Sequence, residues 1–309
     1  MAPGGYAWWY LDALSDDQHH ALVVIAFIGS VFSPYYAAAR ARQGGRTDPQ
    51  QHVAINVALY RTDGGPGARW AMTERGSAAL QRSAHTLAIG PSQLHWDGSA
   101  LVLQLDERCV PLPRRLRGTL RLHPQALGSP TPLALDRAGA HQWWPIAPCA
   151  RVEVDLIDPA WRWQGSGYLD SNRGDVPLED TFNDWQWARA ALADGRSAVV
   201  YDAVERGHDD PRHIALQFDA RGGGQPFEAP ALQLLPVSGW RVPRSQRSEP
   251  GHAPTLLHTL EDTPFYARSL VQAHWLGQPV LAMHESLRLD RFRQPLVQAM
   301  LPFRMPRRG

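Results

Sequence analysis

Residues 161–172 read Trp-Arg-Trp-Gln-Gly-Ser-Gly-Tyr-Leu-Asp-Ser-Asn and join aromatic bulk, glycines and a carboxylic acid in one short stretch. Tryptophan and tyrosine favour a β-strand, whereas glycine permits a bend. We therefore interpret 161–163 as a strand that leads through the glycines into a loop carrying Asp170. Such a loop can aim the acid into a pocket, and the aromatic residues of the surrounding block, 141–187, suit an apolar, electron-rich substrate.

The same β-type pattern extends outward along the chain. Gly and Pro, 26 of each, punctuate short apolar segments rich in β-branched and aromatic residues. Many segments alternate apolar with polar residues, as strands of antiparallel sheets and up-and-down barrels do. The pattern predicts a mainly β, antiparallel fold with strands at 22–28, 53–60, 100–105, 116–122, 151–156, 161–163, 185–189, 198–202, 213–218 and 279–289.

Little helix is expected, at 74–84 and within 289–300, where Pro295 interrupts the second segment. A chain of 309 residues reads as two domains or as one large β-architecture. Prolines bracket a strand between 145 and 159, and the acidic, aromatic block follows. We place the join there and predict an N-terminal β domain at 1–155 and a C-terminal β domain at 156–309.

Composition excludes several classes of function. All 31 basic residues are arginine, so a P-loop lysine and a Schiff-base lysine are absent. Net charge is +1, and no basic block is interleaved with aromatics, so nucleic acid is not an expected partner. The sequence holds no Gly-x-Ser-x-Gly, Gly-x-Gly-x-x-Gly or His-Glu-x-x-His motif. We therefore expect no cofactor and no metal.

The cysteines and the apolar segments indicate a compartment. Cys109 and Cys149 form no CxxC pair, which fits a reducing cytoplasm. The first 14 residues lack the pattern of a secretory signal, and the longest apolar run, 21–28, is far shorter than the roughly 20 residues of a membrane-spanning helix. The arginine-rich segment 291–308 has two interpretations, an anionic membrane contact or a solvated end of the chain.

Asp170 has two interpretations of its own. In an apolar pocket a carboxyl group loses solvation of its charged form, so its pKa rises and it can act as a general acid near neutral pH. Alternatively, Asp170-Ser171-Asn172 is a simple turn, since these side chains satisfy backbone donors locally.

Three residues near Asp170 in the sequence also have a functional and a structural interpretation. Tyr168 and Trp143 could stabilise a cation through their π-faces, or they could be core residues. His141 would share a strand face with Trp143 and could orient the acid or pass a proton to water, or it could be structural.

Two further clusters have ligand-type or acid chemistry. The acids after 174 could form a paired-carboxylate site of the glycosidase kind or a solvated turn: Asp175, Glu179, Asp180 and Asp184. A second set is better explained as a hairpin tip than as a metal site: His208, Asp209, Asp210 and His213.

Several long strings resemble one family, the bacterial carotenoid 1,2-hydratases, also called hydroxyneurosporene synthases. These strings are WWYLDALSDD at 8–17, GSVFSPYY at 29–36, RWAMTER at 69–75, GYLDSN at 167–172, TLEDTPFYARS at 259–269, HESL at 284–287 and AMLPFR at 299–304. The resemblance covers essentially the whole chain.

The resemblance implies two lipocalin-like β-barrel domains and a cofactor-independent hydro-lyase. Its reaction would add water to the terminal C1–C2 double bond of acyclic carotenoids such as neurosporene or lycopene. The family's active residues fall here on His141, Trp143, Tyr168 and Asp170. On this view Asp170 protonates C2, the aromatic residues stabilise a tertiary cation at C1, and water captures that cation.

Two rival functions remain open at this point. A lipocalin-like carrier would bind a carotenoid or lipid in the same apolar pocket without an acid. A carboxylate-pair hydrolase would need two carboxylates about 5–10 Å apart across one groove. The hydratase interpretation adds an expectation of peripheral contact with the cytoplasmic membrane, because its substrate is dissolved there.

Overall fold

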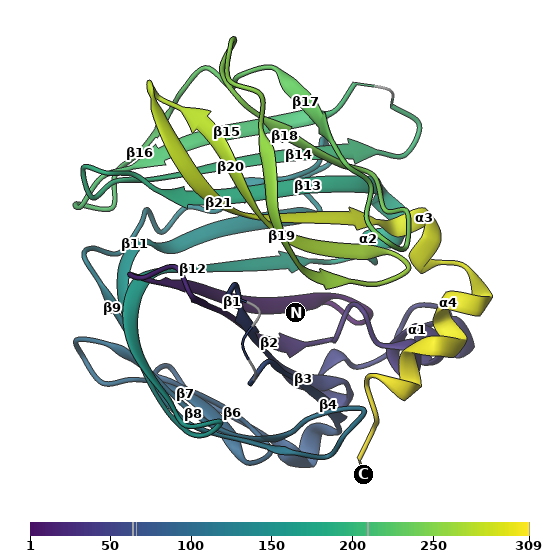
Figure 1. The fold of residues 1–309 in the computed structure, drawn as a ribbon. Helices are drawn as coiled ribbons and strands as arrows, with labels where there is room; N and C mark the ends of the chain where they lie inside the picture. The colour runs from purple at the N-terminus through teal and green to yellow at the C-terminus, as the bar shows by residue number, and fades with distance from the viewer. Residues whose placement is uncertain (64, 66, 209, 309) are drawn as a thin grey trace.

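The computed structural model describes residues 1–63, 65, 67–208 and 210–308, and most of them lie in antiparallel strands. Two large curled sheets and a small two-stranded one make up the strand structure (Figure 1). Mainly β structure with little helix agrees with the fold class predicted from the alternating pattern.

The first sheet curls into the N-terminal half, in the order β4-β3-β2-β1-β12-β11-β9-β8-β7-β6-β5, with β10 beside β11. Its strands are β1 (Tyr6–Ser15), β2 (His20–Ile28), β3 (Val53–Arg61), β4 (Arg69–Arg75), β5 (Leu80–Arg82), β6 (Thr86–Ile89), β7 (Ser92–Trp96), β8 (Leu101–Arg108), β9 (Arg115–Pro124), β10 (Leu133–Ala134), β11 (His141–Asp158) and β12 (Trp161–Gly174).

The second sheet has the order β16-β15-β14-β13-β21-β20-β19, and a separate two-stranded ribbon joins β17 to β18. The strands of the sheet are β13 (Phe182–Ala191), β14 (Ser197–Glu205), β15 (Arg212–Phe218), β16 (Gly224–Pro226), β19 (Thr255–Asp262), β20 (Tyr266–Trp275) and β21 (Gln278–Arg288). The ribbon strands are β17 (Leu232–Leu235) and β18 (Arg244–Arg247).

The helices are short and gather on one side of the molecule (Figure 1). They are α1 (Pro34–Arg42), α2 (Leu178–Thr181), α3 (Leu289–Phe292) and α4 (Pro295–Met300), with single 3-10 turns η1 (Pro49–Gln51), η2 (Ser77–Ala79) and η3 (Leu301–Phe303). No helix in the described ranges combines the length and the apolar character that crossing a bilayer requires.

Strand alternation divides the apolar residues between separate cores. In β1, Leu11 and Ala13 face the interior of the first sheet, whereas Trp8 and Tyr10 join a cluster that includes Trp185 and Tyr201 of the second sheet. This second cluster fills the space between the two sheets, where β13 and β21 lie over β12 and β1 (Figure 1). A strand with both faces buried holds any polar side chain away from water.

The ten predicted strands are all present, and several are longer than expected. The helix expected at 74–84 is wrong: β4 ends at Arg75, one 3-10 turn follows, and β5 pairs with β6. Strand pairing there overrides the helix propensity of the alanines. Helical turns do occupy 289–292 and 295–300, and Pro295 begins the second one, where its missing N–H costs nothing.

The prediction that Asp170 lies in a loop is also wrong. β12 continues through Asp170 to Gly174 and pairs with β1 on one side and β11 on the other. Its backbone groups therefore bond to neighbouring strands rather than to local side chains, and the turn interpretation of Asp170 fails with it.

The division into domains at 155 and 156 stays a prediction. Residue 155 lies inside β11, and the chain passes from the first sheet to the second between β12 and β13. The hairpin expected around 208–213 is present as β14 and β15, although Asp209 lies outside the described residues.

Candidate active site

Asp170 lies at the centre of the face that the first sheet presents to the second. Directly opposite it in the neighbouring strands are Tyr10 of β1 and Pro145 of β11. Residues opposite one another in antiparallel strands project from the same face, so Tyr10 and Asp170 are side-by-side neighbours. The carboxyl group is almost completely buried.

Two aromatic donors hold one oxygen of this carboxyl group. Trp143 Nε1 and the Tyr168 hydroxyl each donate to Asp170 Oδ2 over 2.8 Å. The other oxygen, Oδ1, is buried and has no hydrogen-bond partner within the described chain. Asp12, Glu74 and Glu179 also have one buried oxygen without a partner, but each of those carboxyl groups is paired with an arginine, whereas Asp170 has no cationic partner among the described residues.

Burial raises the pKa of Asp170 to about 8, against the opposing effect of the two hydrogen bonds from Trp143 and Tyr168. The acid is thus protonated at neutral pH. Because Oδ2 accepts two hydrogen bonds, the proton belongs on Oδ1, the oxygen without a partner. Burial also raises the pKa of Tyr168 well above its usual range, which keeps its hydroxyl a donor.

Aromatic rings from both sheets surround the acid. Tyr168 packs against Trp187 of β13, with 5.6 Å between ring centroids, and Trp143 meets Tyr201 of β14 edge-on at the same separation. Tyr10 packs edge-on against Trp187 at 5.2 Å. These faces form the electron-rich surroundings that the sequence predicted near Asp170.

A buried ion pair joins the two sheets beside this cluster. Arg189 of β13 donates through Nε to Asp12 of β1 over 2.8 Å, and its guanidinium lies 5.8 Å from the ring centroid of Tyr168. Both charged side chains are almost inaccessible to water. The pair connects β1 of the first sheet to β13 of the second.

His141 lies apart from the hydrogen bonds around Asp170. Its Nδ1 is 2.9 Å from the Tyr6 hydroxyl, and its Nε2 is 2.8 Å from Thr181 Oγ1. Burial lowers the pKa of His141, so the ring is neutral. The structure brings Trp143, Tyr168 and Asp170 together, whereas His141 bonds to neither of the two aromatic donors nor to the acid.

An apolar cavity of about 290 Å³ opens between the sheets on the side of α3 and α4. Aromatic and aliphatic side chains dominate its wall: Trp8, Ile25, Phe27, Phe32, Met72 and Trp185. It is the kind of space that accepts the end of a hydrocarbon chain.

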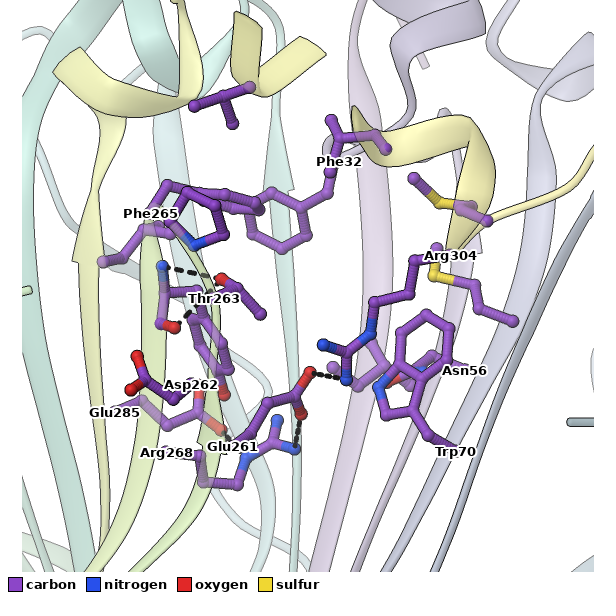
Figure 2. A pocket seen from close by; sticks show the side chains of 18 of the residues that line it. Phe32, Asn56, Trp70, Glu261, Asp262, Thr263, Phe265, Arg268, Glu285 and Arg304 are labelled. Atoms are coloured by element: carbon purple, nitrogen blue, oxygen red, sulfur yellow. Dashed lines mark hydrogen bonds and ion pairs between the residues drawn. The ribbon is translucent and has the colours of Figure 1, made fainter. Parts of the chain in front are cut away.

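Polar groups gather in one part of this cavity. Glu285 Oε1 accepts from the Tyr10 hydroxyl over 2.8 Å and from Arg268 Nε over 2.9 Å. Figure 2 shows Glu261 between Arg268 and Arg304, with Arg304 stacked on Trp70. We call Tyr10, Arg268 and Glu285 the polar floor.

The four predicted site residues do not line the cavity themselves. Tyr10 connects the two regions, because it lines the cavity and is the cross-strand neighbour of Asp170. The acid and its two donors thus lie directly beside the polar floor.

The acids that suggested a carboxylate pair serve other roles. Glu179 pairs with Arg40 at 2.7 Å, and Asp184 lies 3.6 Å from Arg288. Neither these two nor Asp175 and Asp180 line the apolar cavity. These four acids therefore do not form the carboxylate pair that a sugar hydrolase would need in this cavity.

Comparison with known proteins identifies the family. The family model described as carotenoid hydratase CrtC matches residues 24–309. The chain belongs to the carotenoid hydratase family. This membership confirms the resemblance seen in the sequence and the enzyme class expected from it, a hydro-lyase.

Curated relatives extend the match for this carotenoid hydratase family member. The acyclic carotenoid 1,2-hydratase of Thiocapsa roseopersicina is 53% identical over 310 residues, which cover 100% of this chain and 75% of the relative. The corresponding protein of Rubrivivax gelatinosus is 51% identical, with the same coverage. The acyclic carotenoid 1,2-hydratase of Cereibacter sphaeroides is 41% identical, and the match covers 92% of this chain and 98% of the relative.

Solved structures resemble the hydratase-family fold at low sequence identity. A putative AttH from Nitrosomonas europaea superposes with a TM-score of 0.64 at 14% identity, covering 91% of each chain. Kievitone hydratase from Nectria haematococca gives 0.54 at 10% identity and covers 94% of this chain and 92% of its own. These likenesses concern the fold alone and agree with the predicted lipocalin-like β architecture.

The polar floor was missed by reasoning from the sequence. Tyr10 and Glu285 are 275 residues apart, and only the stacking of the two sheets brings them together. The strings WWYLDALSDD and HESL contain these residues, so the family resemblance was the one signal that pointed to them.

Proposed function

We propose that this chain hydrates the terminal C1–C2 double bond of acyclic carotenoids such as neurosporene or lycopene, with Asp170 as the acid and without a cofactor. The observation that carries the proposal is a buried carboxyl group with a pKa of about 8 and one oxygen without a partner, beside an apolar cavity. Family membership supplies the reaction class.

In the proposed first step, the terminal isopropylidene group enters the cavity between the sheets and reaches Asp170 next to Tyr10. Asp170 Oδ1 delivers its proton to C2, the π-bond electrons form the new C–H bond, and C1 becomes a tertiary cation. The hydrogen bonds to Oδ2 then stabilise the carboxylate that remains. Regiochemistry follows from the stability of the tertiary cation.

The aromatic faces around Asp170 support the second part of the proposal. A ring face stabilises a cation by about 0.5–1 kcal/mol at an exposed site and by about 2 kcal/mol or more when both are removed from water. The Tyr168 ring lies next to the acid through its hydroxyl, and Trp187 packs against that ring. Trp143 and Tyr168 thereby gain two roles, as hydrogen-bond donors to the acid and as cation stabilisers.

Water must reach the cation from a defined position, because a wet pocket would favour side reactions. We assign this position to the polar floor, where Glu285 and Tyr10 offer a charged acceptor and a hydroxyl. The water oxygen bonds to C1, and the released proton returns to the Asp170 carboxylate, so the cycle consumes one water and no net proton. His141 is assigned a positioning role, since its contacts to Tyr6 and Thr181 tie β11 to β1 and α2.

The test is incubation with lycopene in detergent, without added cofactor, in ordinary and ¹⁸O-labelled water. We expect pigment heavier by one labelled water, and a loss of about a thousandfold or more in Asp170→Asn with the fold retained. Asp155→Asn, which alters an exposed carboxyl group paired with Arg162, is the matched control and should keep full activity. Unchanged pigment that co-purifies with the protein would instead establish a carrier, and an active Asp170→Asn enzyme would remove the acid from the mechanism.

A further inference from the structure

One side of the apolar cavity is closed by the segment Pro295–Phe303, formed by α4 and η3. Val297, Leu301 and, just after the segment, Met305 turn inward and line the cavity. Two ion pairs hold this region in place, Arg304 with Glu261 and Arg307 with Glu74. We call Pro295–Phe303 the strap.

The outer face of the strap is unusually apolar. Leu296 is 73% exposed and Phe303 is 82% exposed, although the next residue after each, Val297 and Arg304, lines the cavity. Trp240, 51% exposed, lies at the same mouth and also lines the cavity. Large exposed side chains gathered at one opening are typical of an interaction surface.

Three exposed arginines lie close in the chain to these apolar residues, one next to Trp240 and one on each side of the strap. Arg241, Arg293 and Arg308 are exposed, and none has a carboxylate partner among residues 1–63, 65, 67–208 and 210–308. Of the nearby acids, Asp290 pairs with Arg206 and Arg288, whereas Asp262 accepts only the neutral Trp240 N–H and keeps its negative charge. The three arginines outnumber this one acid, so positive charge is in excess beside the strap.

Exposed apolar side chains with arginines near them in the chain match the interface of an anionic bilayer. We propose that Leu296, Phe303 and Trp240, with Arg241, Arg293 and Arg308, form a docking face for anionic lipid. This inference rests on the proposed function, because a carotenoid is dissolved in the bilayer core and enters through the opening beside the strap. Docking would place that opening against the membrane, so that the substrate end passes from lipid to cavity without crossing water.

The experiment is co-sedimentation of the full chain with vesicles of pure phosphatidylcholine and with vesicles containing phosphatidylglycerol. We expect binding to the anionic vesicles, weakened about tenfold or more in Leu296→Ser/Phe303→Ser. Arg293→Gln/Arg308→Gln should lose most of its preference for the anionic vesicles. Leu234→Ser is the matched control: Leu234 is 88% exposed on β17, away from the strap in Figure 1, and its loss should leave binding unchanged.

A second readout separates this inference from the proposed function. Hydration of lycopene dissolved in detergent should be the same in Leu296→Ser/Phe303→Ser and the unmodified chain, while hydration of lycopene in anionic vesicles should fall with binding. If the unmodified chain hydrates lycopene in detergent but ignores anionic vesicles, or if both double variants bind like it, the docking face is wrong. A change from dimer to monomer in Leu296→Ser/Phe303→Ser, with vesicle binding unaltered, would assign the surface to a second copy of the chain and also overturn the proposal.

Discussion

At the scale of single residues, the two oxygens of Asp170 have different roles. Oδ2 accepts hydrogen bonds from Tyr168 and Trp143. These bonds favour the carboxylate and so lower the pKa of Asp170, whereas burial raises it. Activity should therefore fall as pH rises through about 8, where the acid loses its proton.

Tyr168→Phe removes one of the two donors and should raise the pKa of Asp170 further, so the falling limb of the pH–rate profile should move to higher pH. The profile of kcat/KM reports this shift. Tyr10→Phe is the control, because the Tyr10 hydroxyl donates to Glu285 rather than to Asp170; its rate should drop without movement of the limb. If kcat/KM falls at the same pH in Tyr168→Phe and in the unmodified chain, a group other than Asp170 controls the loss of activity.

The same carboxyl group links stability to pH. Its folded pKa of about 8 lies above the unfolded value of roughly 3.9, so between these two values the native state holds a proton that the unfolded state has released. The free energy of unfolding should fall as pH rises across this window, by up to about 1.4 kcal/mol per unit, and level off above about pH 8. Urea denaturation of the unmodified chain and of Asp170→Asn should show this slope in their difference, and a difference independent of pH would contradict it.

At the scale of elements, the Asp12–Arg189 pair joins β1 to β13 where no water reaches either side chain. Arg189→Met leaves the Asp12 carboxyl group buried without its partner, so we expect a loss of about 3–5 kcal/mol in the free energy of unfolding, measured with urea. Asp12→Asn/Arg189→Met should regain part of that loss, because no charge is left unpaired. Arg162→Met breaks an exposed pair with Asp155 and should cost less than about 1 kcal/mol; a similar small cost in Arg189→Met would refute the argument.

Two kinds of strand could be predicted from the sequence. One has alternating residues with a single buried face, such as 151–156, and the other is a dense run of β-branched and apolar residues, such as 22–28. β1 was not predicted as a strand, because it is buried on both faces and so lacks polar alternation. The length of β12 was not predicted for the same reason, because Tyr168, Leu169 and Asp170 are all buried. From the sequence alone, an aspartate followed by Ser and Asn is typical of a turn, and the strands that bury it are not visible. The second sheet buries these residues through tertiary packing, which the local hydrophobic pattern does not predict.

At the scale of the whole molecule, the site exists only because two sheets stack. The acid comes from β12, its ring neighbours from β13 and β14, and the polar floor from β1, β20 and β21. Sequence reasoning selected Asp170, Tyr168 and Trp143 as candidates, both from the residues of the 141–187 block and from the family resemblance, and the structure places all three on the hairpin of β11 and β12. It could not join them to Glu285 or Arg268, which approach across the gap between the sheets.

This arrangement predicts that the substrate end occupies the space between the sheets, and filling that space should abolish turnover without unfolding the protein. Met72 of β4 lines the cavity opposite the second sheet, and about 290 Å³ of free volume can receive the larger ring of Met72→Trp. We expect a loss of about a hundredfold in kcat/KM for lycopene in detergent with the melting temperature retained, because the added indole takes the place of the isoprenoid end. Leu234→Trp adds a ring at an exposed site and should leave kcat/KM unchanged. A fully active and folded Met72→Trp would mean that the carotenoid reaches Asp170 by a different path, and the cavity between the sheets would lose its assignment as the substrate site.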